Sequence, residues 1–347
     1  MRVSKAIGQF AVLPPPIVLQ KTDQPTHQLA LCIQPAFYYA DWVQFIQFME
    51  SWLKLGATKF YFYVHSLAPE LKKVTAIYEK DGPLEVIDWS ELPAQKSHNP
   101  NSLLYRVGVF AAINDCALRA RKETKFVIFT DLDEILAVSK NYSLVRFLEK
   151  RFSKKRNTGA LLIPPVNAHL RVPEKYLEDS TENRAEMLDF DFLEKTERET
   201  YVRKYRPKIV ARPQALFRTH VHKVLQFSSK DFKSVNISKD HCLVYHMRRV
   251  MYPKEPNREK RIPATFLKTL AQPITTTWRR RLRKYHPEGL NLPFRGVSIV
   301  RDLDKCRVNL LARRNQTCQS VYNCKDSIRT VATNQWLFAK NTWVTVI

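Results

Sequence analysis

The amino-acid sequence predicts an α/β fold with a mostly parallel central sheet flanked by helices. Short apolar runs recur along the 347 residues, and segments with apolar residues at helical spacing separate them. Several runs, such as FYFYV at 60–64, are continuously apolar, which is typical of parallel strands that are buried on both faces. Alternation of such strands with helices is the pattern of βαβ units around one sheet.

The first third of the chain supplies three strands and two helices. Asp41 is expected to cap a helix that begins at Trp42, and Gly56 is expected to end it. A second helical stretch runs to Lys80 and stops at the turn sequence Asp81-Gly82-Pro83. The predicted strands of this part are residues 29–33, 60–64 and 84–87.

The rest of the chain continues the alternation. A longer helix is predicted over 103–121, and a further helix contains Leu144, Val145 and Leu148. The residues expected along the apolar face of the longer helix are Leu103, Val107, Phe110, Ala111 and Leu118. Later apolar segments predict strands at 126–130, 160–163, 208–217, 220–227 and 242–247. The charged segment 172–205 is predicted to be a loop around short helices.

Composition removes several classes of function. The chain has only seven glycines and contains neither G-x-G-x-x-G nor G-x-x-x-x-G-K-[ST], so dinucleotide binding of the Rossmann type and P-loop chemistry are disfavoured. The net charge of +24 suits nucleic acid, an anionic membrane or a nucleotide substrate. Because no zinc-finger, RNA-binding or basic-zipper pattern accompanies the basic clusters at 258–261 and 278–286, we predict no nucleic-acid partner.

The six cysteines fall into two groups. Cys32, Cys116 and Cys242 occur singly in apolar segments and are predicted to be buried free thiols. The other three lie close together without zinc-ligand spacing, so a disulfide within this trio is an open alternative in an oxidising compartment. The trio comprises Cys306, Cys318 and Cys324. Sequons for N-glycosylation begin at Asn141, Asn236 and Asn315, and they permit a secretory location without requiring it.

The segment FVIFTDLDEIL at 126–136 carries the most specific chemistry. Asp131 and Asp133 follow the predicted strand directly, and residues two apart in a strand project to the same face. In open α/β sheets, ligands bind at the carboxyl ends of the strands. Since two neighbouring carboxylates repel each other, a divalent cation such as Mn²⁺ or Mg²⁺ is their natural ligand. The pair therefore predicts a metal that presents a diphosphate.

A second enzyme class has a similar sequence motif. Phosphatases of the haloacid-dehalogenase type carry D-x-D-x-[TV] after an apolar strand, and the first Asp is their nucleophile. Here the fifth position is Ile135, and the motif follows three earlier predicted strands instead of opening the domain. Such a phosphatase remains an alternative to the metal site.

The order of several segments resembles glycosyltransferase family 92, a galactosyltransferase-like group abundant in nematodes. These segments lie within 28–255 and read DWVQFIQFMESWLKLGATKFYFYVH, LEVIDW, FTDLDEIL, KIVARPQALF, VHKV and YHMRR. The resemblance implies a GT-A-like nucleotide-sugar-binding fold, Mn²⁺ or Mg²⁺, and a UDP-sugar donor, UDP-galactose. It also implies transfer with inversion to a glycan or glycoprotein acceptor, and a type II protein of the Golgi membrane.

The resemblance also implies roles for individual residues. Asp131 and Asp133 match the D-x-D motif and would bind the metal and the diphosphate, and His246 in YHMRR would be a third metal ligand. Arg248 and Arg249 would contact the diphosphate, because guanidinium groups suit phosphate oxygens. Asp88 would contact the nucleoside at the end of the third strand, and His222 in VHKV matches without a predicted role.

The acceptor side is the least specified part of the sequence. The candidates for a catalytic base are Glu186, Asp189 and Asp191 in the charged loop. Residues 166–195 contain no glycine, whereas family members usually carry an aromatic and glycine-bearing stretch there. A catalytically inactive transferase-like protein that binds glycans is therefore a further alternative.

The expected domain organisation has three parts. Residues 1–26 form an N-terminal leader, 27–255 form the GT-A-like transferase domain, and 256–347 form a basic, cysteine-containing extension that packs on the domain. The leader has no apolar stretch as long as a signal peptide or a membrane span. Membrane association would therefore need a segment that is absent from this chain.

Overall fold

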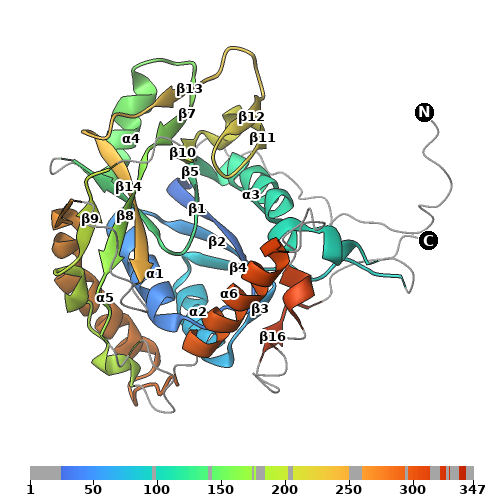
Figure 1. The fold of residues 1–347 in the computed structure, drawn as a ribbon. Coiled ribbons are helices and arrows are strands. Elements are labelled where there is room, and N and C mark those ends of the chain that lie inside the picture. Colours follow the sequence, from blue (N-terminus) through green and yellow to red (C-terminus); the bar gives the residue numbers. More distant parts are fainter. Residues whose placement is uncertain are drawn as a thin grey trace.

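The fold is built around a seven-stranded and a five-stranded sheet (Figure 1). It is a computed structural model that describes residues 25–95, 99–139, 143–173, 176, 184–201, 206–249, 260–293, 296–312, 321–325, 328 and 336–340. The predicted leader and the sequons at Asn141 and Asn315 lie largely or wholly outside these residues.

The seven-stranded sheet has the order β13-β7-β10-β5-β1-β2-β4. Its strands are β1 (His27–Ala36), β2 (Lys59–Val64), β4 (Leu84–Asp88), β5 (Thr124–Thr130), β7 (Thr158–Ile163), β10 (Lys208–Ala211) and β13 (Lys233–Asn236). β5, β1, β2 and β4 are parallel neighbours, as are β13 and β7, and only β10 runs antiparallel to its neighbours. The predicted α/β class, with a mostly parallel central sheet flanked by helices, is confirmed.

Alternate residues of β1 divide the core between the two faces of this sheet. Leu29, Leu31 and Ile33 pack with helices on one face, whereas Ala30 and Cys32 pack with a helix on the other. The first face is covered by α1 (Trp42–Lys54) and α2 (Pro69–Asp81), and the second by α3 (Val109–Glu123) (Figure 1). The capping and stop signals of the first helix are confirmed, because the Asp41 carboxylate accepts from the backbone N–H of Gln44 and the helix ends before Gly56.

The five-stranded sheet has the order β15-β9-β8-β14-β6, and the sequence did not predict it as a separate unit. Its strands are β6 (Glu134–Val138), β8 (Pro165–Leu170), β9 (Glu197–Glu199), β14 (Cys242–Arg249) and β15 (Arg261–Pro263). One face packs against α1 and α5 (Thr265–Tyr285), where Tyr245 meets Phe266 edge-on and Met247 accepts from the Gln47 amide. That face is apolar, whereas the opposite face carries polar side chains such as His246 and Asn167.

Smaller elements complete the described part. α4 (Leu144–Ser153) precedes β7, and η4 (Ala185–Met187) and η5 (Asp191–Leu193) are the short helices expected in the charged segment. β11 (Leu216–Thr219) pairs with β12 (Val224–Phe227), and β16 (Leu337–Phe338) pairs with β3 (Ser66–Leu67). α6 (Gly296–Ala312) and η7 (Val321–Cys324) follow α5.

The helix predicted over 103–121 is wrong in its start and its buried face. Arg106 and Val107 adopt positive φ angles and Gly108 is left-handed, so the continuous helix begins only at Val109. Phe110 and Leu118 are exposed, whereas the buried side chains are Val109, Ala112, Ile113, Cys116, Ala117 and Ala120. Most of these buried side chains are small, so α3 can pack close to the sheet.

Two later strand predictions are also corrected. The segment 208–217 is not one strand, because it breaks at a short turn that begins with Pro213, which has no backbone N–H for the ladder. In the segment 220–227 only residues 224–227 form a strand, and the preceding residues form a turn in which His220 donates its backbone N–H to Lys223. The strands predicted at 126–130, 160–163 and 242–247 are confirmed within β5, β7 and β14.

The prediction of free thiols is wrong for two of three cysteines. Cys32 of β1 and Cys116 of α3 form a disulfide with a Cα–Cα distance of 5.8 Å, whereas Cys242 is free and buried. The two positions are 84 residues apart in the sequence, so only the packing of α3 on β1 reveals the pair. Within the C-terminal trio Cys306 pairs with Cys324, and Cys318 lies outside the described residues.

The region after β14 contributes to the main core. Leu267, Ile274 and Trp278 of α5 are buried in the same cluster as α1 and α2. The boundary predicted at residue 255 stays a prediction. Within the described ranges, no helix has the length and apolar content needed to cross a bilayer.

We predict that Cys116→Ala lowers the free energy of unfolding by about 2–5 kcal/mol, because the lost cross-link frees a long loop in the unfolded chain. Urea unfolding monitored by Trp fluorescence measures this. Cys242→Ala is the matched control, since it also removes a buried sulfur but breaks no cross-link. Equal losses for the two variants would show that the disulfide contributes nothing beyond packing.

Candidate functional site

The candidate site lies where the two large sheets meet. β5 ends at Thr130, a turn contains Asp131 and Asp133, and β6 begins at Glu134. Because β5, β1, β2 and β4 are parallel, this turn lies at the edge formed by their carboxyl ends. The position predicted for the carboxylate pair is therefore confirmed.

The pair lies in a turn after the strand and not within it. The two residues follow the strand instead of lying in it, so the same-face rule for i and i+2 does not apply to them. Asp131 Oδ2 lies 2.9 Å from Lys208 Nζ, whereas Asp133 Oδ2 lies 2.8 Å from His246 Nε2. Each carboxylate therefore has a different side-chain partner.

Lys208 is a buried cation at the centre of this turn. It is the first residue of β10, and the antiparallel register with β5 brings it beside the end of that strand. Its Nζ lies 2.9 Å from Asp131 Oδ2 and 2.7 Å from Glu134 Oε2, and its side chain is 4% exposed. Burial alone would lower the pKa of Lys208, but the two carboxylates raise it overall, so the ammonium stays charged.

The acids around Lys208 differ in their protonation. Burial of Asp131 works to raise its pKa, but the positive charge of Lys208 outweighs burial and lowers it. Burial and the negative charges of Asp131 and Asp133 raise the pKa of Glu134 to about 7, despite the opposing charge of Lys208. Glu134 also accepts the backbone N–H of Asp131 at 3.0 Å, which holds the turn closed.

Asp133, Glu134 and His246 are a candidate metal group. One ligand atom of each lies within 4.8 Å of the others. The 2.8 Å separation of Asp133 Oδ2 and His246 Nε2 is close to the edge of about 3 Å in an octahedron with bonds of about 2.1 Å. Two carboxylates and an imidazole therefore fit a divalent cation that keeps open positions for phosphate oxygens.

Of the two arginines predicted to contact the diphosphate, the structure describes the side chain of Arg248 only. Arg248, two residues after His246 on β14, has Nη1 3.7 Å from Asp133 Oδ2, and its side chain is about half exposed. Its guanidinium therefore lies beside the candidate metal group, where it can contact an anion that such a cation would hold. Arg249 ends β14, and its side chain lies outside the described part of the chain.

The β4 end of this edge contains Asp88, the residue predicted to contact a nucleoside, and lies near a turn at Arg106 and Val107. Asp88 is exposed at the end of β4, three strands from β5 in the sheet order. The next residue, Trp89, donates its indole N–H to the carbonyl of Val107 at 2.8 Å. Positive φ angles at Arg106 and Val107 cost free energy, and such backbone conformations cluster at ligand sites.

His222 lies near the buried cation. Its Nδ1 is 3.2 Å from the carbonyl oxygen of Pro207, the residue before Lys208. Burial, followed by the positive charge of Lys208, lowers the pKa of His222 to about 4. The imidazole is therefore neutral at physiological pH and can offer or accept a hydrogen bond.

The three candidates for the catalytic base lie elsewhere. Glu186 of η4 bonds to Arg184 and to the backbone N–H of Leu290, and Asp191 is an exposed residue of η5. Phe190, between Asp189 and Asp191, donates its backbone N–H to Thr275 of α5. Because α5 covers the apolar face of the five-stranded sheet, the structure does not bring these acids to Asp133.

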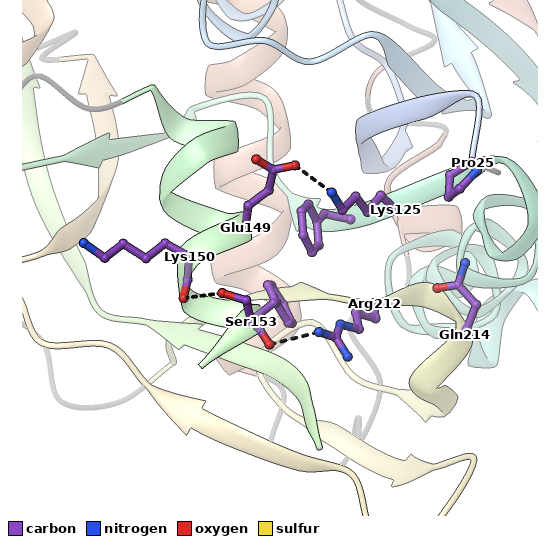
Figure 2. Close-up of a pocket in the computed structure, with 9 residues that line it drawn as sticks. Pro25, Lys125, Glu149, Lys150, Ser153, Arg212 and Gln214 are labelled. Atoms are coloured by element: carbon purple, nitrogen blue, oxygen red, sulfur yellow. Dashed lines mark hydrogen bonds and ion pairs between the residues drawn. The ribbon is translucent and has the colours of Figure 1, made fainter. Parts of the chain in front are cut away.

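A pocket of about 440 Å³ occupies the opposite edge of the central sheet (Figure 2). It is lined by Lys125 at the start of β5, by Glu149 of α4 and by Arg212 after β10, among others. Figure 2 shows Lys125 paired with Glu149, at a distance of 2.6 Å, and Arg212 donates to the carbonyl of Phe152. This pocket is therefore not part of the candidate site.

Sequence reasoning missed Lys208 as a site residue and did not use Glu134. Lys208 opens KIVARPQALF and reads as an ordinary strand start, because its function depends on the register of β10 with β5. Glu134 follows Asp133 directly, so its acidic character was visible in the sequence. Its role as a ligand candidate follows only from the pairing of Glu134 with His246 across β6 and β14.

The sequence matches one family model. The model for glycosyltransferase family 92 matches residues 27–282, which reach into α5. Two relatives from Caenorhabditis elegans are similar. Glycosyltransferase family 92 protein F13G3.3 is 25% identical over 134 residues, 37% of this chain and 26% of its own length. Beta-1,4-galactosyltransferase galt-1 is 23% identical over 233 residues, 66% of this chain and 50% of its own length. The matched parts thus span half or less of these relatives.

Solved structures show weaker likeness. S. aureus TarS 1–349 in complex with UDP is 12% identical, with a TM-score of 0.35, over 92% of this chain and 98% of that chain. The same protein in complex with UDP-GlcNAc is 12% identical, with a TM-score of 0.36, over 88% of this chain and 82% of that chain. Likeness at this level carries no conclusion about a ligand here.

We predict that Lys208→Met destabilises the fold by about 3–5 kcal/mol, because it leaves two carboxylates without their cation. Urea unfolding at pH 7 measures the loss. Lys208→Arg keeps a positive charge and is expected to lose less. Lys233→Met on the exposed strand β13 is the control for the substitution itself. If Lys208→Met is as stable as Lys233→Met, the buried ion pair does not stabilise the turn.

Proposed function

The chain belongs to glycosyltransferase family 92, and from this membership and its acidic site we propose a metal-dependent transferase that moves a hexose from a UDP-sugar to a glycan hydroxyl with inversion. The observation that carries the proposal is the pairing of Asp133 with His246 beside Glu134, at the carboxyl edge of the parallel strands. The matched relatives are longer than the matched region, so the activity is proposed for this chain and not transferred to it.

The metal site would consist of Asp133, His246 and Glu134. A bound Mn²⁺ or Mg²⁺ would supply Lewis-acid stabilisation of the charge that develops on the diphosphate leaving group. Asp131, the first acid of the motif, is the fourth candidate ligand, although Lys208 engages its carboxylate. The ammonium of Lys208 would compensate the negative charge of the acids at this turn.

The diphosphate and the nucleoside would extend along the same edge. Arg248 lies close enough to Asp133 to contact the phosphates, and Arg249 is proposed to assist it from the end of β14. Asp88 would meet the nucleoside at the end of β4, where its exposed carboxylate can accept from a ribose hydroxyl. Neutral His222 near Lys208 could complete this side by hydrogen bonding.

We propose galactose as the sugar and UDP-galactose as the donor. The relative named Beta-1,4-galactosyltransferase galt-1 supports this choice, since it is similar over 66% of this chain. Because the two sequences are 23% identical, this relative supports the class of donor but not the type of glycosidic linkage that is formed. Inversion by a single displacement is proposed because it follows from the family resemblance.

The proposed setting is the Golgi lumen, with a glycan or glycoprotein as acceptor. Two disulfides support an oxidising compartment, because thiols stay reduced in the cytosol. The sequon at Asn236 lies on an exposed part of β13, where a glycan could be attached. Type II membrane anchorage remains part of the proposal.

A second candidate is a transferase-like protein that binds glycans without catalysis. The observation in its favour is Lys208, whose ammonium lies within 2.9 Å of two acids that a metal would otherwise use. A phosphatase of the haloacid-dehalogenase type has less support, because Asp131, its would-be nucleophile, is held by Lys208 and the chain belongs to a transferase family.

We predict that UDP binds this protein more tightly with Mn²⁺ than without, and that Asp133→Ala removes at least about tenfold of the metal-dependent affinity, since a ligand is lost. Isothermal titration calorimetry of UDP, with Mn²⁺ or with EDTA, measures both. Asp231→Ala, in an exposed turn, is the control and is expected to match the wild type.

Either of two results would contradict the proposal. UDP binding that ignores Mn²⁺ in the wild type would remove the metal from the mechanism. UDP binding that is absent in a folded protein would favour the glycan-binding alternative, which a glycan array would then test.

A further inference from the structure

A row of polar side chains crosses the five-stranded sheet from the candidate site. Glu134 of β6 lies opposite His246 of β14, and His246 lies opposite Asn167 of β8. Asn167 in turn bonds to Glu199 of β9. Residues that lie opposite each other on paired strands project to the same face. These four residues, here called the polar row, therefore share the face that α5 does not cover.

The far end of the polar row is a carboxylate held by an amide and an imidazole. Asn167 Nδ2 lies 3.0 Å from both oxygens of Glu199, and His169 Nε2 lies 3.0 Å from Oε1. His169 is two residues after Asn167 and so lies on the same face of β8. The Glu199 side chain is 11% exposed, and that of His169 is 15% exposed.

The contact with Glu199 favours one tautomer of the histidine. When the carboxylate of Glu199 is ionised it only accepts hydrogen bonds, and Nε2 of His169 is then the donor. In the neutral ring the lone pair then lies on Nδ1. A histidine oriented by a buried carboxylate, with its other nitrogen available, is the arrangement that activates a hydroxyl in many enzymes.

We propose that His169, oriented by Glu199, is the base that accepts the proton of the acceptor hydroxyl. The inference rests on the proposed transferase function. The acceptor oxygen would form a bond to the anomeric carbon as the bond from that carbon to the diphosphate oxygen breaks, and UDP would leave with the electron pair. The hydroxyl proton would pass to Nδ1 of His169 and from there to solvent. Glu199 and Asn167 are positioning residues, because they act through His169.

The spacing of the strands suits this role. His169 lies one strand interval, about 4.8 Å, from β14 and two residues along the strand from the position opposite His246, so the two backbones are roughly 8 Å apart. A hexosyl group between the metal-bound diphosphate and the attacking hydroxyl would occupy that span. Arg248 lies opposite His169 in the β8–β14 register and two residues after His246 on the same face of β14. The base predicted in the charged loop, by contrast, is tied to α5 on the other face.

A purely structural role for His169 would also explain why the carboxylate of Glu199 has hydrogen-bond partners. It would not explain why the partner is a histidine with a partly exposed ring, on the same face as the candidate metal group. The experiment must therefore separate loss of proton transfer from loss of structure. Azide does this, because as an anion it attacks the anomeric carbon without giving up a proton.

The test compares the wild type with His169→Gln, Glu199→Gln and the control His241→Gln, which changes an exposed histidine in the turn before β14. Each protein is given UDP-galactose and Mn²⁺ with a panel of methyl glycosides, and UDP release and galactoside formation are measured. UDP binding is measured by calorimetry in parallel. His169→Gln is expected to lose about 100-fold or more in transfer to hydroxyls. Its UDP affinity should stay within about twofold, and its rate with azide should match the wild type. Glu199→Gln is expected to lose less, and His241→Gln nothing.

Two results overturn the inference in distinguishable ways. If the wild type transfers galactose and His169→Gln does so at the same rate, the proposed function stands and the assignment of the base is wrong. If His169→Gln loses transfer to azide and to hydroxyls alike, the histidine has a structural role. Failure of the wild type to bind UDP overturns the proposed function itself, and with it the role of His169.

Discussion

The buried ammonium of Lys208 is the interaction on which the arrangement of the site depends. It binds both Asp131, which directly follows β5, and Glu134, which begins β6. β5 belongs to the seven-stranded sheet and β6 to the five-stranded sheet, so one side chain from β10 fixes the turn at which the chain passes between them. Burying the ammonium of Lys208 is costly, and the cost is offset because two carboxyl groups lie within 2.9 Å of it.

Most of what surrounds the site follows from this junction. Once Asp131 is engaged, Asp133 is left to face the five-stranded sheet, where β14 presents His246 beside it. The same strand pairing puts Glu134 next to His246 and Asn167 on its other side. The apolar face of that sheet is taken up by α1 and α5, which leaves the polar side chains on the face that can meet a ligand. The proposed metal group and the proposed base thus share one surface.

The sequence predicted the elements better than their relations. Continuous apolar runs located β2, β5 and β7, and the acids after β5 located the carboxyl edge, because both signals are local. The partners of those acids depend on register between strands far apart in the chain, so Lys208 and the pairing of Cys32 with Cys116 could not be read from spacing. The buried face of α3 was missed for a local reason, since positive φ angles before Gly108 shift the start of the helix. Asn167 and His169 alternate within an apolar strand, a signal that the sequence did contain.

The disulfide between β1 and α3 constrains the order in which this protein can assemble. Both sulfur-bearing residues are fully buried between the sheet and the helix, so no oxidising enzyme could reach them in the finished fold. The bond must therefore close while α3 is still loosely docked on the sheet. A chain that packs first would enclose two reduced thiols and would have to open again to correct them. The redox state of this buried pair is therefore set before packing of the core is complete.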